Sequence, residues 1–514
     1  MTSRMIYIVD FGSQTAHLIG RRIRDLGIEH IVTKPSEIMS AIQKQKPAGI
    51  IFSGGPSSVY EKNAPTIDKK IFQLNIPILG ICYGWQLTAH LLDGKVVQGS
   101  REYGPTKVTI DKHNPLFKGI ATKDIAVWMS HGDEVVMLPT GFDYHAFTPQ
   151  VKAAGVADIE RNIFGLQFHP EVEHTQEGRV ILKNFVEKVC GLKTAPRSIS
   201  VDQITNEIRE QVEQYDNKSV AIAAVSGGVD STVASALVAK ALGKRFIPIF
   251  CNNGLMRYGT DKEVRMIFQD ILGVKPMIVN CKKDFLRALK DVTDPEKKRI
   301  IIGKKYIDTF VKAAEHIPHA KFLVQGTIYS DVIESKGSEH AHKIKSHHNV
   351  GGLPKNLTFT LIEPLRSCYK DEVRMIGRRL GLPEWVTQKQ PFPGPGYAIR
   401  IIGKVTEQRL LKEIQADQIV CDVLKKHGMY DKVFQSFAIM TGALSTAVKG
   451  DGRIYGEVVA IRVYDSSDVM TAGWSHLPYD IMQELSTRIV NEVEGVSRVV
   501  YDITTKPPAT MEWE

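Results

Sequence analysis

Short apolar runs, each followed by a glycine-containing turn, restrict this chain to a small set of folds. Three of them, at 6–9, 48–52 and 76–81, stand near the start of the sequence, and two more follow at 220–225 and 246–251. Strands that are buried on both faces of a parallel sheet are continuously apolar in this way. The sequence therefore predicts an α/β fold whose strands end in turns that can carry functional groups.

The length of the chain predicts more than one domain. Its 514 residues exceed what one hydrophobic core covers, and roughly 150 residues per domain gives about three domains. Glycine, proline and small polar residues break the pattern at Cys190–Ser198, and the prolines of Pro391–Gly396 can continue neither a helix nor a central strand. We expect an α/β domain over 1–192, a second α/β domain over 200–390 and a small α+β domain over 391–514.

The elements of the second and third domains follow from the same patterns. Helices are predicted at 201–215, 229–242, 406–427 and 479–493, and strands at 220–225, 246–251, 433–440, 454–464 and 498–503. The first two of these strands form a βαβ unit with the helix between them. Ser335–Gly352 is polar and has no periodicity, so we expect a mobile loop there.

Composition excludes several classes of protein. Hydrophobic residues make up 43% of the chain, charged residues 24% and aromatic residues 8%, which excludes a disordered, fibrous or coiled-coil protein. No apolar run reaches the roughly 18 residues of a membrane helix, and the first strand begins too early to leave room for a signal peptide. Six widely spaced cysteines without a CxxC pair suit a reducing cytoplasm. The net charge of +9 fits either a solvated surface or a preference for anionic ligands such as nucleotides.

Cys82 stands between two glycines, Gly80 and Gly84, where a predicted strand meets a predicted helix. A nucleophile on a sharp strand-to-helix turn needs small flanking residues, because larger side chains would clash with the tight backbone. The turn also puts the sulfur near a helix N-terminus, where the dipole favours the thiolate. We predict that Cys82 is a nucleophile; the alternative is an ordinary buried cysteine.

A candidate base and its orienting carboxylate stand downstream, at His169 and Glu171. Residues i and i+2 of an extended segment project to the same side, and Pro170 favours extended backbone at His169. The imidazole can then act as base while the carboxylate fixes its tautomer. Ser53–Pro56, after a predicted strand, is either an oxyanion hole or a simple turn.

A second glycine-rich turn joins the strand at 220–225 to the next helix. Its residues are Ser226, Gly227, Gly228, Val229, Asp230 and Ser231. Glycines let the backbone approach a phosphate closely, and the helix N-terminus faces the anion. Asp230 could hold Mg²⁺ bound to those phosphates. The turn lacks the Gly-Lys-Ser/Thr ending of a Walker loop, so transfer of the γ-phosphate is not indicated.

Four histidines, at 340, 342, 347 and 348, crowd the polar loop. No cysteine or carboxylate accompanies them at zinc spacing. We therefore expect them to contact phosphate or nucleotide rather than a metal.

The segments GGP (54–56), GICYGWQ (80–86), MSHGD (129–133) and FHPE (168–171) together resemble the class I glutamine amidotransferases. The resemblance implies that Cys82, His169 and Glu171 are catalytic, and that Cys82 attacks the glutamine carboxamide and releases ammonia. It also implies that Gln86 and the backbone at Ser130 and His131 help to hold glutamine, beside Gly55 of the candidate oxyanion hole.

SGGVDS (226–231) resembles the PP-loop of the N-type ATP pyrophosphatases. The resemblance implies that ATP is split between its α and β phosphates and that an adenylyl group activates a substrate oxygen. It places Asp331, Glu334 and Lys370 around the triphosphate and substrate, and Lys345 on a lid formed by the loop at 335–352.

The third domain carries the most specific resemblance. PFPGPG (391–396), GDGRIYGEVVAIR (450–462) and DITTKPPATMEWE (502–514) resemble the glutamine-hydrolysing GMP synthases, and the likeness covers essentially the whole chain. It implies that the C2 oxygen of xanthosine 5′-monophosphate (XMP) is adenylylated, and that ammonia then gives GMP, AMP and pyrophosphate. It also implies ATP as co-substrate, Mg²⁺ and a homodimer formed through this domain. The residues that it places on XMP are Arg299, Gly394, Pro395, Gln435, Lys506, Met511 and Glu512.

Two positions depart from that family's usual pattern. Asn252 stands where the family usually has Asp, and Leu444 where it usually has Arg. The first change keeps hydrogen bonding but loses a charge, and the second puts in doubt one anionic contact near the substrate phosphate or the dimer interface.

Two other functions remain open from the sequence. A PP-loop enzyme that modifies tRNA or forms NAD is one, although a tRNA enzyme of this kind would more plausibly carry paired cysteines or a zinc-binding segment, and neither is present. A nucleic-acid-binding or regulatory protein is the other, but its groove would need basic residues interleaved with aromatic ones. We therefore expect small-molecule partners (glutamine, ATP and XMP), no nucleic acid and no membrane.

Overall fold

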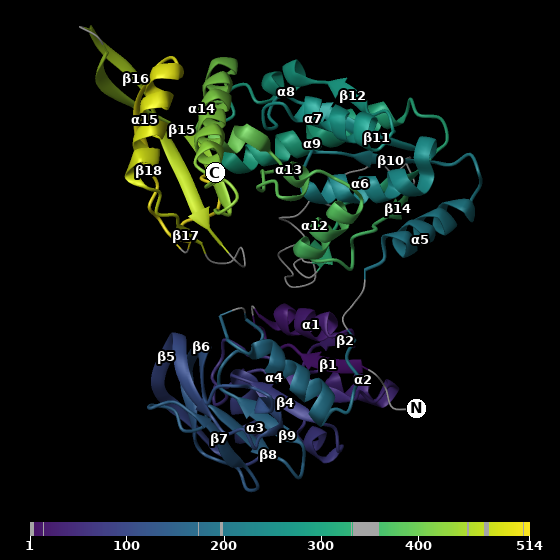
Figure 1. The fold of residues 1–514 in the computed structure, drawn as a ribbon, viewed down its shortest axis with the longest axis vertical. Helices are drawn as coiled ribbons and strands as arrows, with labels where there is room; N and C mark the ends of the chain where they lie inside the picture. Colours follow the sequence, from purple (N-terminus) through teal and green to yellow (C-terminus); the bar gives the residue numbers. More distant parts are fainter. Residues whose placement is uncertain are drawn as a thin grey trace. The chain divides into compact units, whose positions relative to one another are not determined.

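The computed structural model describes residues 5–13, 15–172, 174–195, 199–329, 331–332, 359–449, 452–466, 472–506 and 508–514. The polar loop expected at 335–352 lies outside these residues, as do the candidate site residues Glu334 and Lys345. The chain divides into two compact units, Met1–Ser198 and Ile199–Glu514, which are each described by themselves below (Figure 1).

Within its described residues, the first unit contains a nine-stranded sheet with the strand order β2-β1-β3-β4-β9-β8-β7-β5-β6. Its strands are β1 (Met5–Val9), β2 (Glu29–Thr33), β3 (Gly49–Phe52), β4 (Ile78–Ile81), β5 (Lys95–Ile110), β6 (Asp124–Met137), β7 (Asp143–Phe147), β8 (Gly155–Asp158) and β9 (Ile163–Leu166). Its helices are α1 (Ala16–Asp25), α2 (Ile38–Lys44), α3 (Tyr83–Leu91) and α4 (Gly178–Asn184). The first five strands of this order, β2, β1, β3, β4 and β9, pair in parallel with their neighbours. The pairs among β9, β8, β7, β5 and β6 are antiparallel.

The parallel part of this sheet explains the apolar runs in the sequence. Ile8, Ile51 and Ile81, one from each of three adjacent strands, have no exposed surface. Because both faces of these strands are covered, every position along them is apolar rather than every second one. Their carboxyl ends lie along one edge of the sheet, so the turns that follow them meet there.

The long antiparallel strands β5 and β6 were not predicted. Along β6 the side chains of Ile125, Val127 and Met129 are buried, whereas the residues between them are not. One face of this pair is therefore solvated, and polar residues alternate with apolar ones along the strands. The criterion of a continuous apolar run does not identify such strands.

The second unit contains, within its described residues, a five-stranded parallel sheet with the order β12-β11-β10-β13-β14 and a second sheet in which β16 pairs with β15, β17 and β18. The strands are β10 (Val220–Ala224), β11 (Phe246–Asn252), β12 (Met277–Asn280), β13 (Ala320–Val324), β14 (Thr360–Ile362), β15 (Gln435–Lys449), β16 (Gly452–Asp465), β17 (Gly473–Trp474) and β18 (Val496–Tyr501). The helices are α5 (Val201–Glu213), α6 (Val229–Leu242), α7 (Thr260–Arg265), α8 (Lys282–Ala288), α9 (Pro295–Ala314), α12 (Lys370–Arg379), α13 (Glu384–Thr387), α14 (Glu407–Lys426) and α15 (Tyr479–Glu492). Short 3₁₀ turns lie at Lys69–Gln73, Pro115–Phe117, Gly243–Arg245 and Gly396–Arg400, and π-helical turns at Phe185–Val189 and Met266–Ile271.

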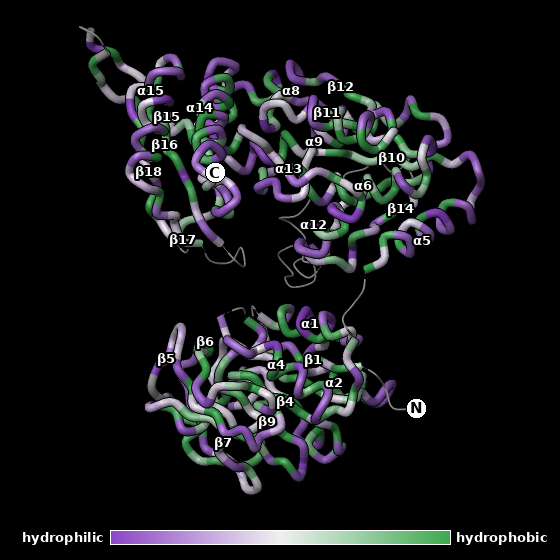
Figure 2. The backbone as a smooth tube through the Cα atoms, in the orientation of Figure 1, coloured by the Kyte–Doolittle hydropathy of each residue, from purple (hydrophilic) through white to green (hydrophobic). Residues whose placement is uncertain are grey.

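One continuous core connects the two sheets of the second unit. Ile222 and Leu323 of the parallel sheet belong to the same buried cluster as Met440 of β15 and Leu485 of α15. Hydrophobic residues gather inside each unit along the strands and on the inner faces of the helices (Figure 2). The fold class is therefore the expected one, while the division of this unit near residue 391 stays a prediction.

Within the described residues, no helix combines the length and the apolar character that a membrane span requires.

Candidate active sites

Four turns of the first unit meet at the carboxyl edge of its parallel strands. They follow β1, β3, β4 and β9, which are neighbours in the sheet. The turn after β4 carries Cys82, the turn after β3 carries Gly54, and the segment after β9 carries His169 and Glu171. Residues that are far apart in the sequence are thus brought to one place by the strand order.

Cys82 occupies a strained turn between β4 and α3. Its backbone has φ 50° and ψ −108°, a conformation that non-glycine residues adopt only when their surroundings enforce it. A side chain at Gly84 would put its Cβ 2.6 Å from the Cβ of Phe52, and one at Gly80 would put it 2.7 Å from the oxygen of Gly84. The small flanking residues are therefore required by packing, as the sequence pattern indicated.

His169 and Glu171 are held together next to this turn. Their Nδ1 and Oε1 atoms lie 2.8 Å apart, and Glu171 has no exposed surface. Burial opposes a charge on His169, but the Glu171 carboxylate and Cys82 outweigh it and raise the pKa of His169 well above its usual value. Burial also opposes the charge of Glu171, yet His169 and the hydrogen bonds from His169 and Thr15 hold the pKa of Glu171 below its usual value. The arrangement suits an imidazole that takes up a proton.

The turn after β3 borders the same space. A Cβ at Gly54 would lie 3.1 Å from Cε1 of His169 and 3.8 Å from the Cβ of Cys82, so only a backbone without a side chain fits comfortably there. A Cβ at Gly55 would lie 2.9 Å from the oxygen of Phe11. Backbone N–H groups at such a bare turn can approach an oxyanion closely.

The predicted glutamine contacts line the other side of Cys82. The sulfur lies 3.6 Å from the oxygen of Ser130, and Gln167 donates to it from 3.7 Å. Gln86 is buried and donates to the backbone oxygen of Asp133, which lies 2.8 Å away. The side chain of His131 faces Glu102 at 3.4 Å and is also buried. Gln167 was not found from the sequence, although it stands two residues before His169 and so projects to the same side.

The glycine-rich turn of the second unit joins β10 to α6. Ser226 and Ser231 approach each other to 3.2 Å between their hydroxyl oxygens, and the Gly228 N–H donates to Ser226. Gly227 has φ +76°, and a Cβ there would lie 2.6 Å from Cγ2 of Thr260. The backbone is thus held in a curved turn at a helix N-terminus, the geometry that binds phosphate.

Asp230 in the first turn of α6 is paired with Lys370 of α12, at 2.6 Å between Oδ2 and Nζ. The other oxygen, Oδ1, is buried and has no hydrogen-bond partner in the described part of the chain. Gly326, two residues after the end of β13, packs so closely against this turn that a Cβ would lie 2.9 Å from the N of Ser231. Asp331 accepts from the Ile328 N–H at 3.0 Å and so shapes the neighbouring turn.

Lys389 reaches the same turn and was missed in the sequence. Its Nζ donates to the oxygen of Gly227 at 3.3 Å and to Glu263. Burial lowers the pKa of Lys389, and Glu263 opposes this effect. A basic residue two positions before a proline-rich break was the available signal. Two residues later the oxygen of Pro391 accepts from Gln435 at 3.2 Å, so this short segment links the glycine-rich turn to the C-terminal sheet.

The C-terminal tail is fixed to the core of the second unit by buried charges. Glu512 pairs with Arg400 and accepts from Gln435 at 2.9 Å. Glu514 pairs with Lys298, whose side chain has no exposed surface, and its backbone oxygen accepts from Arg299. Lys298 and Arg400 were not found from the sequence, because nothing in their local pattern shows that they are buried.

The remaining predicted residues lie around this tail or beside the proline-rich segment. Lys506 exchanges two backbone hydrogen bonds with Ala472, and the oxygen of Met511 accepts from Arg462. Gly394 has open space where a Cβ would stand, and Pro395 directly precedes the 3₁₀ turn at Gly396–Arg400.

Neither of the two residues that depart from the family pattern takes part in the hydrogen bonds named above. The backbone oxygen of Asn252, at the end of β11, accepts from Cys281. Leu444 lies on β15 opposite Glu457, with 55% of its surface exposed.

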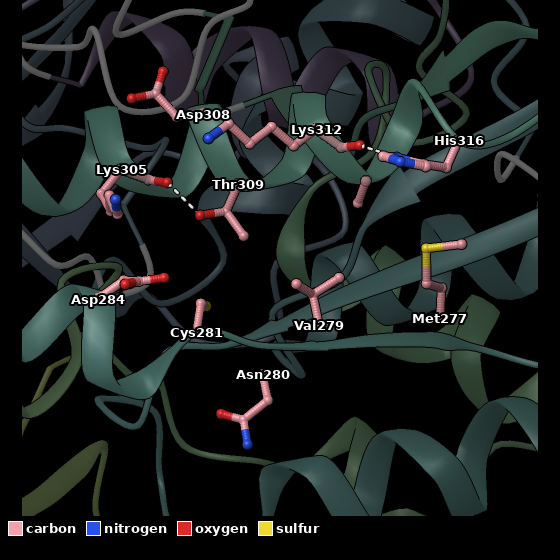
Figure 3. A pocket seen from close by; sticks show the side chains of 11 residues that line it. Met277, Val279, Asn280, Cys281, Asp284, Lys305, Asp308, Thr309, Lys312 and His316 are labelled. Atoms are coloured by element: carbon pink, nitrogen blue, oxygen red, sulfur yellow. Dashed lines mark hydrogen bonds between the residues drawn. The ribbon is translucent and has the colours of Figure 1, made fainter.

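A groove of about 370 Å³ lies between β12 and α9, and none of the predicted site residues lines it. Figure 3 shows Lys305, Lys312 and His316 on the helix side and Val279 on the strand side.

Comparison with known proteins covers the whole chain. A family model described as glutamine amidotransferase class-I matches residues 7–189, one described as NAD synthase matches 200–309, and one described as GMP synthase C terminal domain matches 422–513. A GMP synthase [glutamine-hydrolyzing] of a Nitratiruptor species is 47% identical over 99% of both chains. The protein of the same name from Aquifex aeolicus is 47% identical over 100% of both chains, and that from Carboxydothermus hydrogenoformans is 48% identical over 100% of both. Likeness of this extent, with the amidotransferase-like turn and the phosphate-binding turn on separate units, means that this chain belongs to the glutamine-hydrolysing GMP synthase family.

Proposed function

We propose that this chain converts XMP, ATP, glutamine and water into GMP, AMP, pyrophosphate and glutamate. Its relatives over the full length are named as glutamine-hydrolysing GMP synthases. In the structure, the proposal rests mainly on the contacts of the segment from Lys389 to Pro391. Lys389 contacts the phosphate-binding turn, and Pro391 contacts Gln435. Adenylylation requires ATP and the acceptor oxygen to be adjacent, and this segment supports such a juxtaposition.

The glutamine half-reaction is proposed for the first unit. Cys82 attacks the carboxamide carbon, His169 takes the thiol proton and passes it to the departing ammonia, and Glu171 stabilises the imidazolium. The bare turn at Gly54 and Gly55 receives the oxyanion. Water then hydrolyses the thioester to glutamate, with His169 acting as base. The backbone oxygen of Ser130 lies 3.6 Å from the sulfur, and Gln86 donates to the backbone of Asp133 in the same segment. These contacts support a role of Gln86 and of the backbone at Ser130 and His131 in holding glutamine.

The adenylylation half-reaction is proposed for the second unit. The turn from Ser226 to Ser231 binds the phosphates of ATP with its N–H groups and hydroxyls. Lys370 and Lys389 supply positive charge on either side of that turn. The XMP oxygen attacks the α-phosphate, and pyrophosphate leaves. The negative charge that develops on the leaving pyrophosphate is stabilised by these cations. Asp331 shapes the adjoining turn, and Glu334 and Lys345 remain predicted contacts outside the described residues.

Asp230 is the proposed Mg²⁺ ligand. Its unpartnered buried oxygen Oδ1 fits a hard cation, because carboxylate oxygens are the ligands that Mg²⁺ prefers. Within the described residues no three His, Cys, Asp or Glu side chains gather as a metal cage, but Mg²⁺ at phosphate sites takes most of its ligands from phosphate and water. When bound, Mg²⁺ neutralises phosphate charge. Lys370 would then hold the second oxygen of Asp230 and keep the first one aimed at the phosphates.

The XMP site is proposed at the junction of the tail and the proline-rich segment. Gln435 and Glu512 offer an amide and a carboxylate side by side, which suits the donors and acceptors of a purine edge. Lys506 and Arg299 would bind the phosphate, and Gly394, Pro395 and Met511 would border the base. Arg299 already donates to the last backbone oxygen of the tail, so XMP binding and tail position are coupled in this proposal.

Three broader features belong to the same proposal. Domains over 1–192, 200–390 and 391–514 would supply ammonia, adenylyl transfer and substrate binding. A homodimer through the third domain is supported by three large side chains of the β15–β16 hairpin, Leu444, Val448 and Tyr455, which are 55%, 73% and 69% exposed. A cytoplasmic location is supported by six cysteines that are all free thiols.

Product analysis tests the proposed reaction. The full chain is incubated with XMP, ATP, Mg²⁺ and glutamine, and the nucleotides are separated. We expect GMP, AMP and pyrophosphate in equal amounts. ADP and phosphate would contradict the assignment of the phosphate-binding turn, and AMP formation only when XMP is replaced by the acid precursor of NAD would favour the NAD-forming alternative.

A further inference from the structure

The carboxylate that orients His169 has a second donor. Thr15 donates its hydroxyl hydrogen to Oε1 of Glu171 at 2.7 Å, and this is the same oxygen that accepts from Nδ1 of His169 at 2.8 Å. Thr15 immediately precedes α1, in the turn after β1, so it reaches the carboxylate from a different part of the sequence than the residues already described. Two donors on the same oxygen fix the position of that oxygen and also stabilise its negative charge.

The turn after β1 holds the Thr15 hydroxyl in place. Ser13 and Thr15 have their hydroxyl oxygens 2.9 Å apart, and the Thr15 N–H donates to the Ser13 hydroxyl at 3.1 Å. Because Thr15 gives its own hydrogen to Glu171, the Ser13 hydroxyl must donate to Thr15. Asp10 in turn accepts from the N–H groups of Gly12 and Ser13. The chain of hydrogen bonds therefore runs in one direction, from the turn towards Glu171.

Two further side chains near Glu171 hold backbone rather than carboxylate, while the carboxylate also accepts from its own backbone N–H. Arg22 of α1 donates to the backbone oxygen of Glu171 at 3.0 Å, and Thr175 donates to the backbone oxygen of His169 at 2.5 Å. The second carboxylate oxygen, Oε2, is buried without a partner in the described residues. Without the Thr15 hydroxyl the buried carboxylate would keep His169 as its side-chain partner and could rotate about its last torsion, which is a soft one.

We propose that Thr15 is a positioning residue of the glutamine site, whose hydroxyl holds the Glu171 carboxylate in the rotamer that faces His169. The inference rests on the proposed roles of Cys82, His169 and Glu171. It adds a fourth group to them, one that touches neither glutamine nor the sulfur.

A hydroxyl deletion with a conservative counterpart tests this role in the full chain. Thr15→Val removes the hydroxyl and keeps the shape, and Thr15→Ser restores it. Thr109→Val is the matched control, since Thr109 also donates to a carboxylate, that of Asp124, at 2.7 Å on the exposed side of the same unit. Glutamate release is measured against glutamine concentration and pH for all three, with XMP and ATP present. Thermal unfolding and ammonia-driven synthesis check that each variant is folded.

For Thr15→Val we expect kcat for glutamate release to fall on the order of tenfold with KM within about twofold. The acid limb of the pH profile should also move. As the pH falls, His169, whose pKa is raised, takes up a proton first, and Glu171, whose pKa is lowered, does so afterwards. Losing the Thr15 hydrogen bond raises the pKa of Glu171, so the lower part of the limb, which reports that carboxylate, shifts to higher pH. The charged or titratable groups around Glu171, namely His169, Cys82 and Arg22, are unchanged in the variant.

The outcomes separate this inference from the function on which it rests. Near-normal kcat and an unmoved acid limb in a folded Thr15→Val protein would overturn the inference, as would a Thr15→Ser protein as impaired as Thr15→Val. Rescue by serine with a normal Thr109→Val protein supports it. If Glu171→Gln itself releases glutamate at the normal rate, the proposed role of Glu171 fails, and the positioning role fails with it.

Discussion

The carboxylate of Glu512 lies against the guanidinium of Arg400, with both Nε–Oε2 and Nη2–Oε1 at 3.1 Å. The side chain of Arg400 has no exposed surface, and its Cζ lies 4.1 Å from the ring centre of Phe437 and 4.8 Å from that of Phe392. Arg400 also donates to Asp417 at 3.3 Å. The tail residue proposed to contact XMP is thus anchored to a buried cation rather than left as a loose end.

Arg400→Met should destabilise the second unit strongly. It removes the cation paired with Glu512 and one of the two cations near Asp417, the other being Arg257 at 3.9 Å. Removing one partner of a buried pair costs on the order of 3–5 kcal/mol. Urea unfolding of the full chain measures the change. The control is Arg488→Met, which breaks an exposed pair with Glu492 and should cost about 0.5 kcal/mol or less. Equal effects of the two substitutions would show that the Arg400 pair does not anchor the tail.

Lys506→Ala should raise the XMP concentration needed for half-maximal rate. Loss of one charge-assisted phosphate contact is worth on the order of tenfold in affinity, while the ATP requirement should change little. The backbone pairing of residue 506 with Ala472 does not need the side chain, so the fold should persist. Steady-state kinetics and sedimentation velocity check both points, with Lys404→Ala as control. An unchanged XMP requirement in a normally assembled protein would remove Lys506 from the proposed site.

Cys82→Ala should end glutamine-driven synthesis and preserve synthesis from ammonium salts. The sulfur is the proposed nucleophile of one unit, whereas the phosphate-binding turn lies on the other. Cys190→Ala, at a half-buried free cysteine of the same unit, serves as control and should keep both activities. If Cys82→Ala loses ammonia-driven synthesis to the same extent, the two half-reactions are not separate.

Asp230→Asn should impair both glutamine-driven and ammonia-driven synthesis, because they share adenylylation. The substitution removes the carboxylate charge that faces the proposed Mg²⁺ and pairs with Lys370, and we expect kcat to fall by at least on the order of tenfold. The control is Asp202→Asn, since Asp202 forms an exposed pair with Lys240 in the same unit. Near-normal rates for Asp230→Asn at saturating Mg²⁺ would show that Asp230 has a structural role in the turn and does not bind Mg²⁺.

Helices and buried strands were accessible from the sequence because their pattern is local. α6 spans Val229–Leu242 as predicted, and α14 (Glu407–Lys426) lies within one residue of the prediction at each end. The strand-to-helix turns with Cys82 and Asp230 were found for the same reason: small residues and a nucleophile or an acid stand at fixed offsets in a short segment.

What the sequence did not reveal depends on pairing at long range. Arg400 and Glu512 are 112 residues apart, and Thr15 and Glu171 are 156 apart. No local rule indicates that a particular arginine is buried against two phenylalanine rings. Nor does one indicate that a threonine before a helix faces a carboxylate in the segment after a distant strand. The antiparallel pair β5–β6 was missed because its apolar residues alternate with polar ones, a pattern that continuous apolar runs do not capture.

The fate of the C2 oxygen of XMP tests the central claim most directly. XMP labelled with ¹⁸O at that position is converted with ATP and glutamine, and the products are examined by mass spectrometry. If the oxygen attacks the α-phosphate of ATP and is then displaced by ammonia, the label must leave with AMP, and GMP and pyrophosphate must be unlabelled. Label found in water or in pyrophosphate, with unlabelled AMP, would contradict adenylylation of XMP by this chain.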